Sequence, residues 1–200
     1  GYNATFDPAF SSCGQVTRNP ANAAFPVVTG VVENASSLRT SGIDFALDAT
    51  APSAIGELHV GFLASYLREW DLHYGGLPVV SRAGTMGDLL GDAYPRWKGV
   101  AMLDWRRSAF SVGAKLRYIG AMESKYFSYD PASVVNIPSR VYVDVDASVA
   151  LSDRLTLRAG ASNVTDVSPP LFTSPPQMNT DPSTYDVVGR RYFARVGLRF

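Results

Sequence analysis

The sequence predicts an all-β fold, an antiparallel β-barrel that crosses a membrane with its strands. Three observations predict it: about seven segments alternate apolar and polar residues, their polar positions carry many charges, and short and long connections alternate between them. Successive side chains of a strand point to opposite sides, so this alternation gives each strand an apolar face and a charged face. A membrane barrel accommodates both, because its outside meets lipid and its inside meets water.

Residues 186–200 show the pattern most clearly. A soluble sheet could not easily bury a row of arginines, whereas the inside of a barrel places such a row against water and other charges. Apolar Tyr192, Ala194, Val196, Leu198 and Phe200 share one face of this strand, and Arg191, Arg195 and Arg199 share the other.

The same alternation predicts six earlier strands. Val100 and Met102 are its main exceptions, because they place apolar side chains on the otherwise polar face of their strand. These six strands span residues 39–51, 57–66, 97–106, 110–118, 141–151 and 155–162.

The connections between the strands also alternate. Long extracellular loops on one side and short periplasmic turns on the other are typical of outer-membrane barrels, and a generic sandwich has no reason to show them. Short turns are expected near residues 52–55, 107–109 and 152–154, and long loops over residues 70–94, 121–139 and 164–185.

Trp97 and Trp105 are expected to mark the two membrane interfaces. Eight residues at ~3.3 Å each, tilted by roughly 40°, separate the two rings by about 20 Å along the membrane normal. That separation is close to the height of the apolar band, about 25 Å, which girdles of aromatic residues flank on both sides.

Composition is compatible with a barrel. The 200 residues include 18 Lys+Arg and 18 Asp+Glu, so a formal net charge of zero gives no reason to expect a nucleic-acid partner. There is no run of about 18 apolar residues to form a transmembrane helix, and the first residues do not resemble a signal peptide. We therefore expect a mature protein or an internal fragment.

An odd number of strands also points to a part of a larger barrel, because bacterial single-chain barrels normally close with an even number. We expect residues 1–26 to form an extracellular loop segment and residues 27–200 to form the barrel portion. Cys13, the one cysteine, lies in the loop segment. It either pairs with a cysteine outside this chain or is a free thiol, and spacing does not decide between the two.

Three segments resemble the carboxy-terminal barrel region of TonB-dependent outer-membrane receptors. Residues 33–45, ENASSLRTSGIDF, are similar to a family strand that reads N-A, a small or basic stretch, then G-[IV]-[DE]. Residues 155–166, LTLRAGASNVTD, are similar to L-x-L-R-x-G-x-x-N-L-F-D, with Val-Thr in place of Leu-Phe. Residues 184–193, TYDVVGRRYF, are similar to Y-D-x-x-G-R-x-[YF] at the start of the last strand.

The resemblance implies a barrel of about 22 strands filled by a plug domain, in the outer membrane of a Gram-negative bacterium. These residues would supply the last seven strands, with Phe200 as the assembly terminus, while the plug and the TonB-contacting segment are absent from this chain. The implied partners are lipid, the plug, the remaining strands, the inner-membrane TonB complex and a small-molecule ligand. Siderophore, carbohydrate and cobalamin receptors share the pattern.

The charges on the inner face are expected to pair across strands or with the plug, since a charge left uncompensated at low dielectric is costly. Asp144 and Asp146 are two such inner-face carboxylates rather than a catalytic pair, because no nucleophile or base of defined geometry accompanies them, so no enzymatic activity is expected. The inner-face charges singled out are Asp44, Asp48, Lys115, Arg117, Asp144, Asp146, Arg158, Arg191 and Arg195.

The long loops carry the residues expected to bind a ligand. Exposed rings beside polar groups can stack on a sugar or hold an aromatic chelator, although such rings also form girdles or pack loop on loop. His59 and His73 have no ligand-like spacing, so neither a metal site nor a cofactor is expected. The loop residues singled out are Trp70, His73, Tyr74, Tyr126, Phe127, Tyr129 and Phe172.

Two other functions stay open from the sequence. A small self-contained barrel with a structural or adhesive role would need an eighth strand within residues 2–32, where Pro8, Pro20 and Pro26 disfavour one. A soluble β-sandwich that acts as a binding module or hydrolase would instead cover the apolar strand faces with a second sheet.

Overall fold

The computed structural model describes residues 16–17, 27–28, 36–74, 78–87, 92–125, 132–173 and 179–199. The chain divides into two compact units, Gly1–Ser36 and Ser37–Phe200. In the first unit, β1 (Val16–Thr17) pairs antiparallel with β2 (Val27–Val28). Cys13, Phe200 and the predicted loop residues Tyr126, Phe127 and Tyr129 lie outside the described residues.

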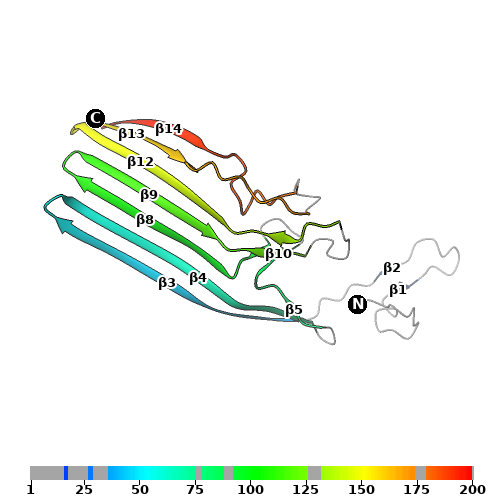
Figure 1. Cartoon of the computed structure of the whole chain (residues 1–200). Helices are drawn as coiled ribbons and strands as arrows, with labels where there is room; N and C mark the ends of the chain where they lie inside the picture. Colours follow the sequence, from blue (N-terminus) through cyan, green and yellow to red (C-terminus); the bar gives the residue numbers. More distant parts are fainter. Residues whose placement is uncertain are drawn as a thin grey trace. The chain divides into compact units, whose positions relative to one another are not determined.

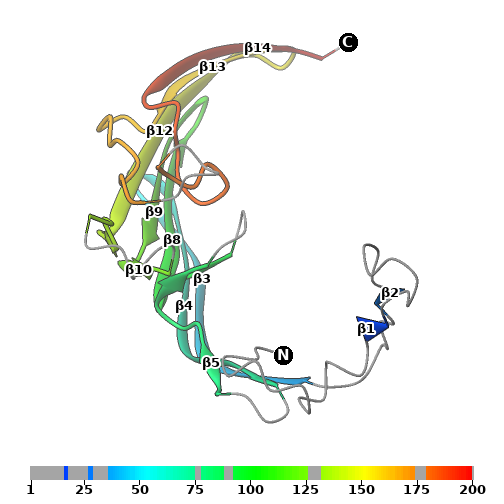
Figure 2. The ribbon, with the colours of Figure 1, turned by 90° about the vertical axis from the view of Figure 1, so that its right-hand side faces the viewer.

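The second unit is built around one meandering antiparallel sheet, which confirms the predicted all-β class (Figure 1). Each long strand pairs with the long strand that precedes it in the chain, and Figure 2 shows the resulting sheet as curved. No described helix is long and apolar enough to cross a membrane. The seven long strands are β3 (Ser36–Ser53), β4 (Gly56–Tyr74), β8 (Trp97–Arg107), β9 (Phe110–Ile119), β12 (Arg140–Ser152), β13 (Leu155–Ser162) and β14 (Arg191–Leu198).

The first hairpin is longer than the alternation predicts. β4 continues past Tyr66 to Tyr74, and its last part pairs with the short β5 (Val80–Ser81) through Leu72 opposite Val80. Residues 67–71 include several charged residues. These interrupt the alternation of apolar and polar residues, so the sequence predicts a loop there. Trp70, His73 and Tyr74 therefore lie on a strand and not in a loop as predicted.

The predicted short turns are confirmed at Ala54–Ile55, Ser108–Ala109 and Asp153–Arg154, each two residues long. The end of β14 lies beside the last of these turns, because the Arg199 amide donates a hydrogen bond of 2.9 Å to the Arg154 carbonyl. The three turns thus share one end of the sheet with the end of β14, and the long connections share the other end (Figure 1).

Strand register keeps the two faces distinct. The apolar face is open to its surroundings: Ile43, Val112 and Leu198 are 56%, 50% and 64% exposed. This exposure contradicts a sandwich in which a second sheet buries these side chains. One apolar row runs through Leu103, Ala114, Val145, Ala161 and Tyr192, and one polar row runs through His59, Asp104, Gly113, Asp146 and Gly160.

The long connections form a second, smaller sheet that the sequence does not reveal. Its strands have two or three residues, too few for an alternating pattern to stand out. The middle pair, β10 and β6, is parallel, unlike every pair of the main sheet. The order is β11 (Asn136–Ile137), β10 (Met122–Ser124), β6 (Thr85–Met86) and β7 (Ala93–Tyr94).

A buried core joins the three long connections. We call it the loop cluster, and its buried members are Met86, Met122, Ile137, Tyr142, Phe172 and Tyr185. Tyr142 is opposite Arg117 on the charged face of the main sheet, so the loop cluster covers that face at the end with the long connections. Phe172 is only 2% exposed, and its predicted exposure to a ligand is therefore wrong: the ring packs against the other connections.

Asn163 organises the start of the last long connection. Its side chain is fully buried, donates from Nδ2 to the Val167 carbonyl and accepts from the Val167 amide, both at 2.9 Å. Its own amide donates to the Asp144 carboxylate, also at 2.9 Å. Its φ of 50° is left-handed, a conformation that asparagine tolerates better than most residues.

The last two segments that resemble the TonB-dependent receptors contact each other. The Asp166 carboxylate accepts the Arg190 amide at 2.9 Å and lies 3.7 Å from the Arg190 guanidinium. Gly189, which precedes Arg190, has a φ of 78°, and a Cβ there would approach Asp166 Oδ1 to 3.2 Å. These contacts fix where β14 begins relative to β13.

Gly160→Ala is expected to destabilise the protein, because a Cβ at residue 160 would lie 2.5 Å from the Val145 carbonyl oxygen and 2.7 Å from a ring atom of Phe193. Overpacking of this kind costs about 1 to 3 kcal/mol. The matched control is Gly197→Ala on the neighbouring strand, whose Cβ would meet only Thr156 at ordinary distances. Urea unfolding of both variants checks this, and equal midpoints would contradict it.

Asn163→Gly and Asn163→Ala should separate the two contributions of that residue. Both lose two side-chain hydrogen bonds, about 1 kcal/mol each, but only alanine adds the cost of a left-handed φ, about 1 to 2 kcal/mol. Hydrogen exchange at the Val167 amide should accelerate in both variants and more in Asn163→Ala. Equal acceleration would show that backbone conformation contributes nothing.

Candidate functional site: the charged face and the loop cluster

The predicted inner-face residues share one side of the main sheet, which we call the charged face. Register places Lys115 opposite Asp144, Arg117 opposite Tyr142, and Arg158 opposite Arg195. Asp48 joins them by contacting His59, which lies opposite Asp104. The charged face consists of Asp44, Asp48, Glu57, His59, Lys98, Asp104, Arg106, Lys115, Arg117, Asp144, Asp146, Arg158, Arg191 and Arg195.

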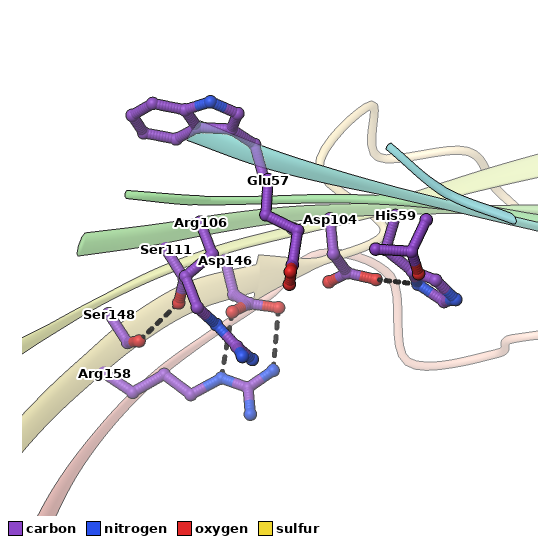
Figure 3. A pocket seen from close by; sticks show the side chains of 11 residues that line it. Glu57, His59, Asp104, Arg106, Ser111, Asp146, Ser148 and Arg158 are labelled. Atoms are coloured by element: carbon purple, nitrogen blue, oxygen red, sulfur yellow. Dashed lines mark hydrogen bonds and ion pairs between the residues drawn. The ribbon is translucent and has the colours of Figure 1, made fainter. Parts of the chain in front are cut away.

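His59 lies between two carboxylates near the short-turn end. Its Nε2 is 3.0 Å from Asp48 Oδ2. Its Nδ1 is 3.6 Å from Asp104 Oδ2, a contact that is marked in Figure 3. The imidazole thereby links β3, β4 and β8. The sequence shows His59 as an isolated histidine, since both of its contacts depend on how three strands pair, which no spacing reveals.

Arg158 and Asp146 form the most direct ion pair of the face. Two guanidinium nitrogens donate to the two carboxylate oxygens, each at 2.9 Å (Figure 3). Gly113 and Gly160 stand on either side of Asp146 in the register and leave room for its carboxylate. A Cβ at residue 113 would lie 2.9 Å from Asp104 Oδ1 and 3.2 Å from Asp146 Oδ1.

These side chains surround an open polar hollow of ≈ 590 Å³, whose lining includes Glu57, His59, Arg106 and Arg158. Figure 3 shows the lining side chains, including the hydrogen bond of 2.7 Å that Ser111 and Ser148 share. Charges of both signs line the hollow, so it is suited to contact with another polar surface. Among the described residues, no group of three or more His, Cys, Asp or Glu side chains could hold a metal ion.

Arg117 connects the charged face to the loop cluster. Its guanidinium lies 3.9 Å from Asp144, 4.0 Å from Asp186 and 5.1 Å from the centroid of the Tyr142 ring. Arg191 lies 3.4 Å from the same nearly buried Asp186 carboxylate. Asp186 is thus held between two arginines and Asp144 lies beside Arg117, so the last long connection is tied to β9 and β14.

Several cations of the charged face form no ion pair with any residue that the structure describes. Lys115 stands opposite Asp144, but that carboxylate is engaged by the Asn163 amide and Arg117. Arg195 stands opposite Arg158, which pairs with Asp146 instead. Within the same described part, the cations without an ion pair are Lys98, Arg106, Lys115 and Arg195, and the acids are Asp44 and Glu57.

At the long-connection end, Trp70 packs on Tyr94 with ring centroids 4.7 Å apart. The two rings border a hollow of ≈ 400 Å³ that also includes Asp44 and Lys98. Burial and the neighbouring Asp92 raise the pKa of Tyr94 to about 12, so its hydroxyl stays protonated to a higher pH than an ordinary tyrosine. The sequence alone does not single out Tyr94, because its partner ring, Trp70, lies on another strand.

The two tryptophans proposed for the interfaces lie at opposite ends of β8. Trp97 is on the apolar face at the long-connection end, where its ring lies 4.7 Å from Tyr66 and 6.3 Å from Phe45 between centroids. Trp105 stands opposite Leu58 and Val112, near the short turns. The arrangement places aromatic side chains at both ends of the apolar face.

Comparison with solved structures finds proteins of similar fold. A mutant ferric enterobactin receptor, PfeA, from Pseudomonas aeruginosa matches with a TM-score of 0.54 and 20% identity over 80% of this chain and 22% of that chain. A second PfeA mutant, in complex with enterobactin, gives 0.53 and 21% over the same shares. At such identities the likeness shows the fold alone, and the chain spans about 22% of the length of these receptors.

No curated protein sequence matches the chain. A family model described as "TonB dependent receptor-like, beta-barrel" matches residues 3–164, which is most of the chain. The match covers six of the seven long strands in full, and the sheet that they form has the hairpin order and two-sided character expected of such a barrel. The chain therefore belongs to the family of TonB-dependent receptor-like β-barrels.

Proposed function

We propose that this chain forms part of the wall of an outer-membrane receptor that imports a scarce small molecule with energy delivered through TonB. The observation that carries the proposal is the sheet with two different faces. One face exposes apolar side chains, and the other pairs charges across strands beneath folded long connections. Lipid on one side and a polar lumen on the other satisfy both faces, and membership of the family supports this orientation.

In this proposal the charged face lines the lumen and contacts a plug domain. Its internal pairs, such as Arg158 with Asp146, limit the number of charges left uncompensated where water is scarce. The apolar face meets lipid, with Trp97 and Trp105 at the two interfaces. The described sheet has β3 and β14 as its edges, and an open edge in lipid is costly, so other strands complete the wall.

A ferric siderophore is the ligand class we favour, with carbohydrate and cobalamin as the alternatives. The Trp70 and Tyr94 rings stand beside Lys98 in one hollow, a combination that suits an aromatic, anionic chelator. The fold likeness to structures named as ferric enterobactin receptors is compatible with this choice. Tyr126, Phe127 and Tyr129 stay candidates for ligand contact, whereas the buried Phe172 is withdrawn.

The proposal is tested on the whole gene product in its native envelope. We expect the protein in the outer-membrane fraction, with heat-modifiable gel migration, and import of one labelled probe among ferric enterobactin, cobalamin and a maltooligosaccharide. Import should stop when the proton gradient is dissipated. A water-soluble product would refute the membrane role, and a heat-modifiable protein that imports no probe would favour a structural or adhesive barrel.

Tyr74→Ala and Trp70→Ala should each weaken binding of the imported probe at least roughly fivefold, about 1 kcal/mol, because aromatic anchors carry much of a binding energy. Leu171→Ala is the matched control, since Leu171 is exposed in a long connection but has no polar handle. Equilibrium binding to outer-membrane fractions measures all three. Unchanged affinity in both aromatic variants would place the ligand elsewhere.

A further inference from the structure

An apolar patch interrupts the charged face, and we call Leu63, Val100 and Met102 the inner patch. Leu63 lies directly opposite Val100, and Met102 lies opposite Gly61, over which its terminal methyl group folds. Leu63 is 54% exposed and Met102 is 39% exposed. Exposed apolar side chains grouped on a face that is otherwise charged mark a contact surface.

The inner patch borders a small recess. Leu63, Val100 and Ile119 line a hollow of ≈ 240 Å³, and Lys98 and Arg117 stand at its margin. That volume corresponds to roughly eight waters at about 30 Å³ each, enough for one large apolar side chain. Ile119 also packs against the loop cluster, so the hollow lies next to the part of the charged face that the loop cluster covers.

The charges around the inner patch favour an acidic neighbour. Lys98 lies two residues before Val100 on the same face of β8, opposite Ile119, and Lys115 lies opposite Met102 on β9, so two lysines border the patch. Neither lysine forms an ion pair within the part of the chain that the structure describes. Asp144, the acid nearest to Lys115 in register, is already engaged by Asn163 and Arg117.

We propose that the inner patch docks a segment of the domain that fills the barrel, and that this segment carries one large apolar side chain flanked by carboxylates. The inference rests on the proposed function, because only then does the charged face point into a lumen. The apolar side chain enters the hollow beside Leu63, and the carboxylates pair with Lys98 and Lys115. This arrangement covers the exposed apolar surface and compensates both lysines.

A photocrosslinking amino acid at residue 63 of the whole receptor tests the docking. Phe62 provides the matched control, because it is the adjacent residue, is 43% exposed and points to the apolar face. We expect residue 63 to link to a peptide from the same polypeptide, outside these 200 residues, with Asp or Glu within a few positions of the linked side chain. Residue 62 should give no such link.

The lysines are tested in the same assay. Lys98→Glu combined with Lys115→Glu should lower the crosslink yield from residue 63 severalfold, whereas Lys125→Glu, in a long connection, should leave it unchanged. Heat-modifiable migration verifies folding, and Lys98→Gln with Lys115→Gln replaces the double reversal if that variant fails to fold. An unchanged yield, no link from residue 63, or a linked peptide without nearby acids would overturn the proposal.

Failure of this inference is distinguishable from failure of the proposed function. A link from residue 63 to an acidic peptide with no import of any probe would support the docking surface and refute the transport role. Probe import without that link would support the transport role and refute the docking surface.

Discussion

Cross-strand register is the constraint on which the rest of the structure depends. A shift of one residue between two strands would send a whole set of side chains to the opposite face. With the observed register, Asp104, Gly113, Asp146 and Gly160 fall in one row, so carboxylates alternate with glycines that leave room for them. The ion pairs, the polar hollow and the open apolar face all follow from this alignment.

The sequence was sufficient to predict the strands wherever the period of two is intact, as in β12, where Val143, Val145 and Ala147 alternate with Asp144, Asp146 and Ser148. It was insufficient where charge interrupts the period, as at Arg68 and Glu69 within β4. The loop cluster was also beyond reach, because Met86, Met122 and Phe172 come from three separate connections and share no spacing.

For the candidate site, the face occupied by each charge was predictable, but its partner was not. Asp146 forms an ion pair with Arg158 on the adjacent strand. Asp144 lies opposite Lys115 on the same face but forms no ion pair with it. The difference arises from Asn163, whose amide and left-handed backbone direct a turn toward Asp144. Long-range hydrogen bonds of this kind decide which charges stay available to another surface.

The loop cluster has a consequence for how such a protein can diverge. Its buried side chains, apart from Tyr142 of β12, come from three connections, so a change in size at Met122 or Phe172 must be matched by changes in the other two connections. Sequence variation would then accumulate at outward positions such as Val134 and Leu171, whose side chains are exposed. Related barrels should therefore conserve the interior of the loop cluster as a unit, while the residues on its outer surface vary.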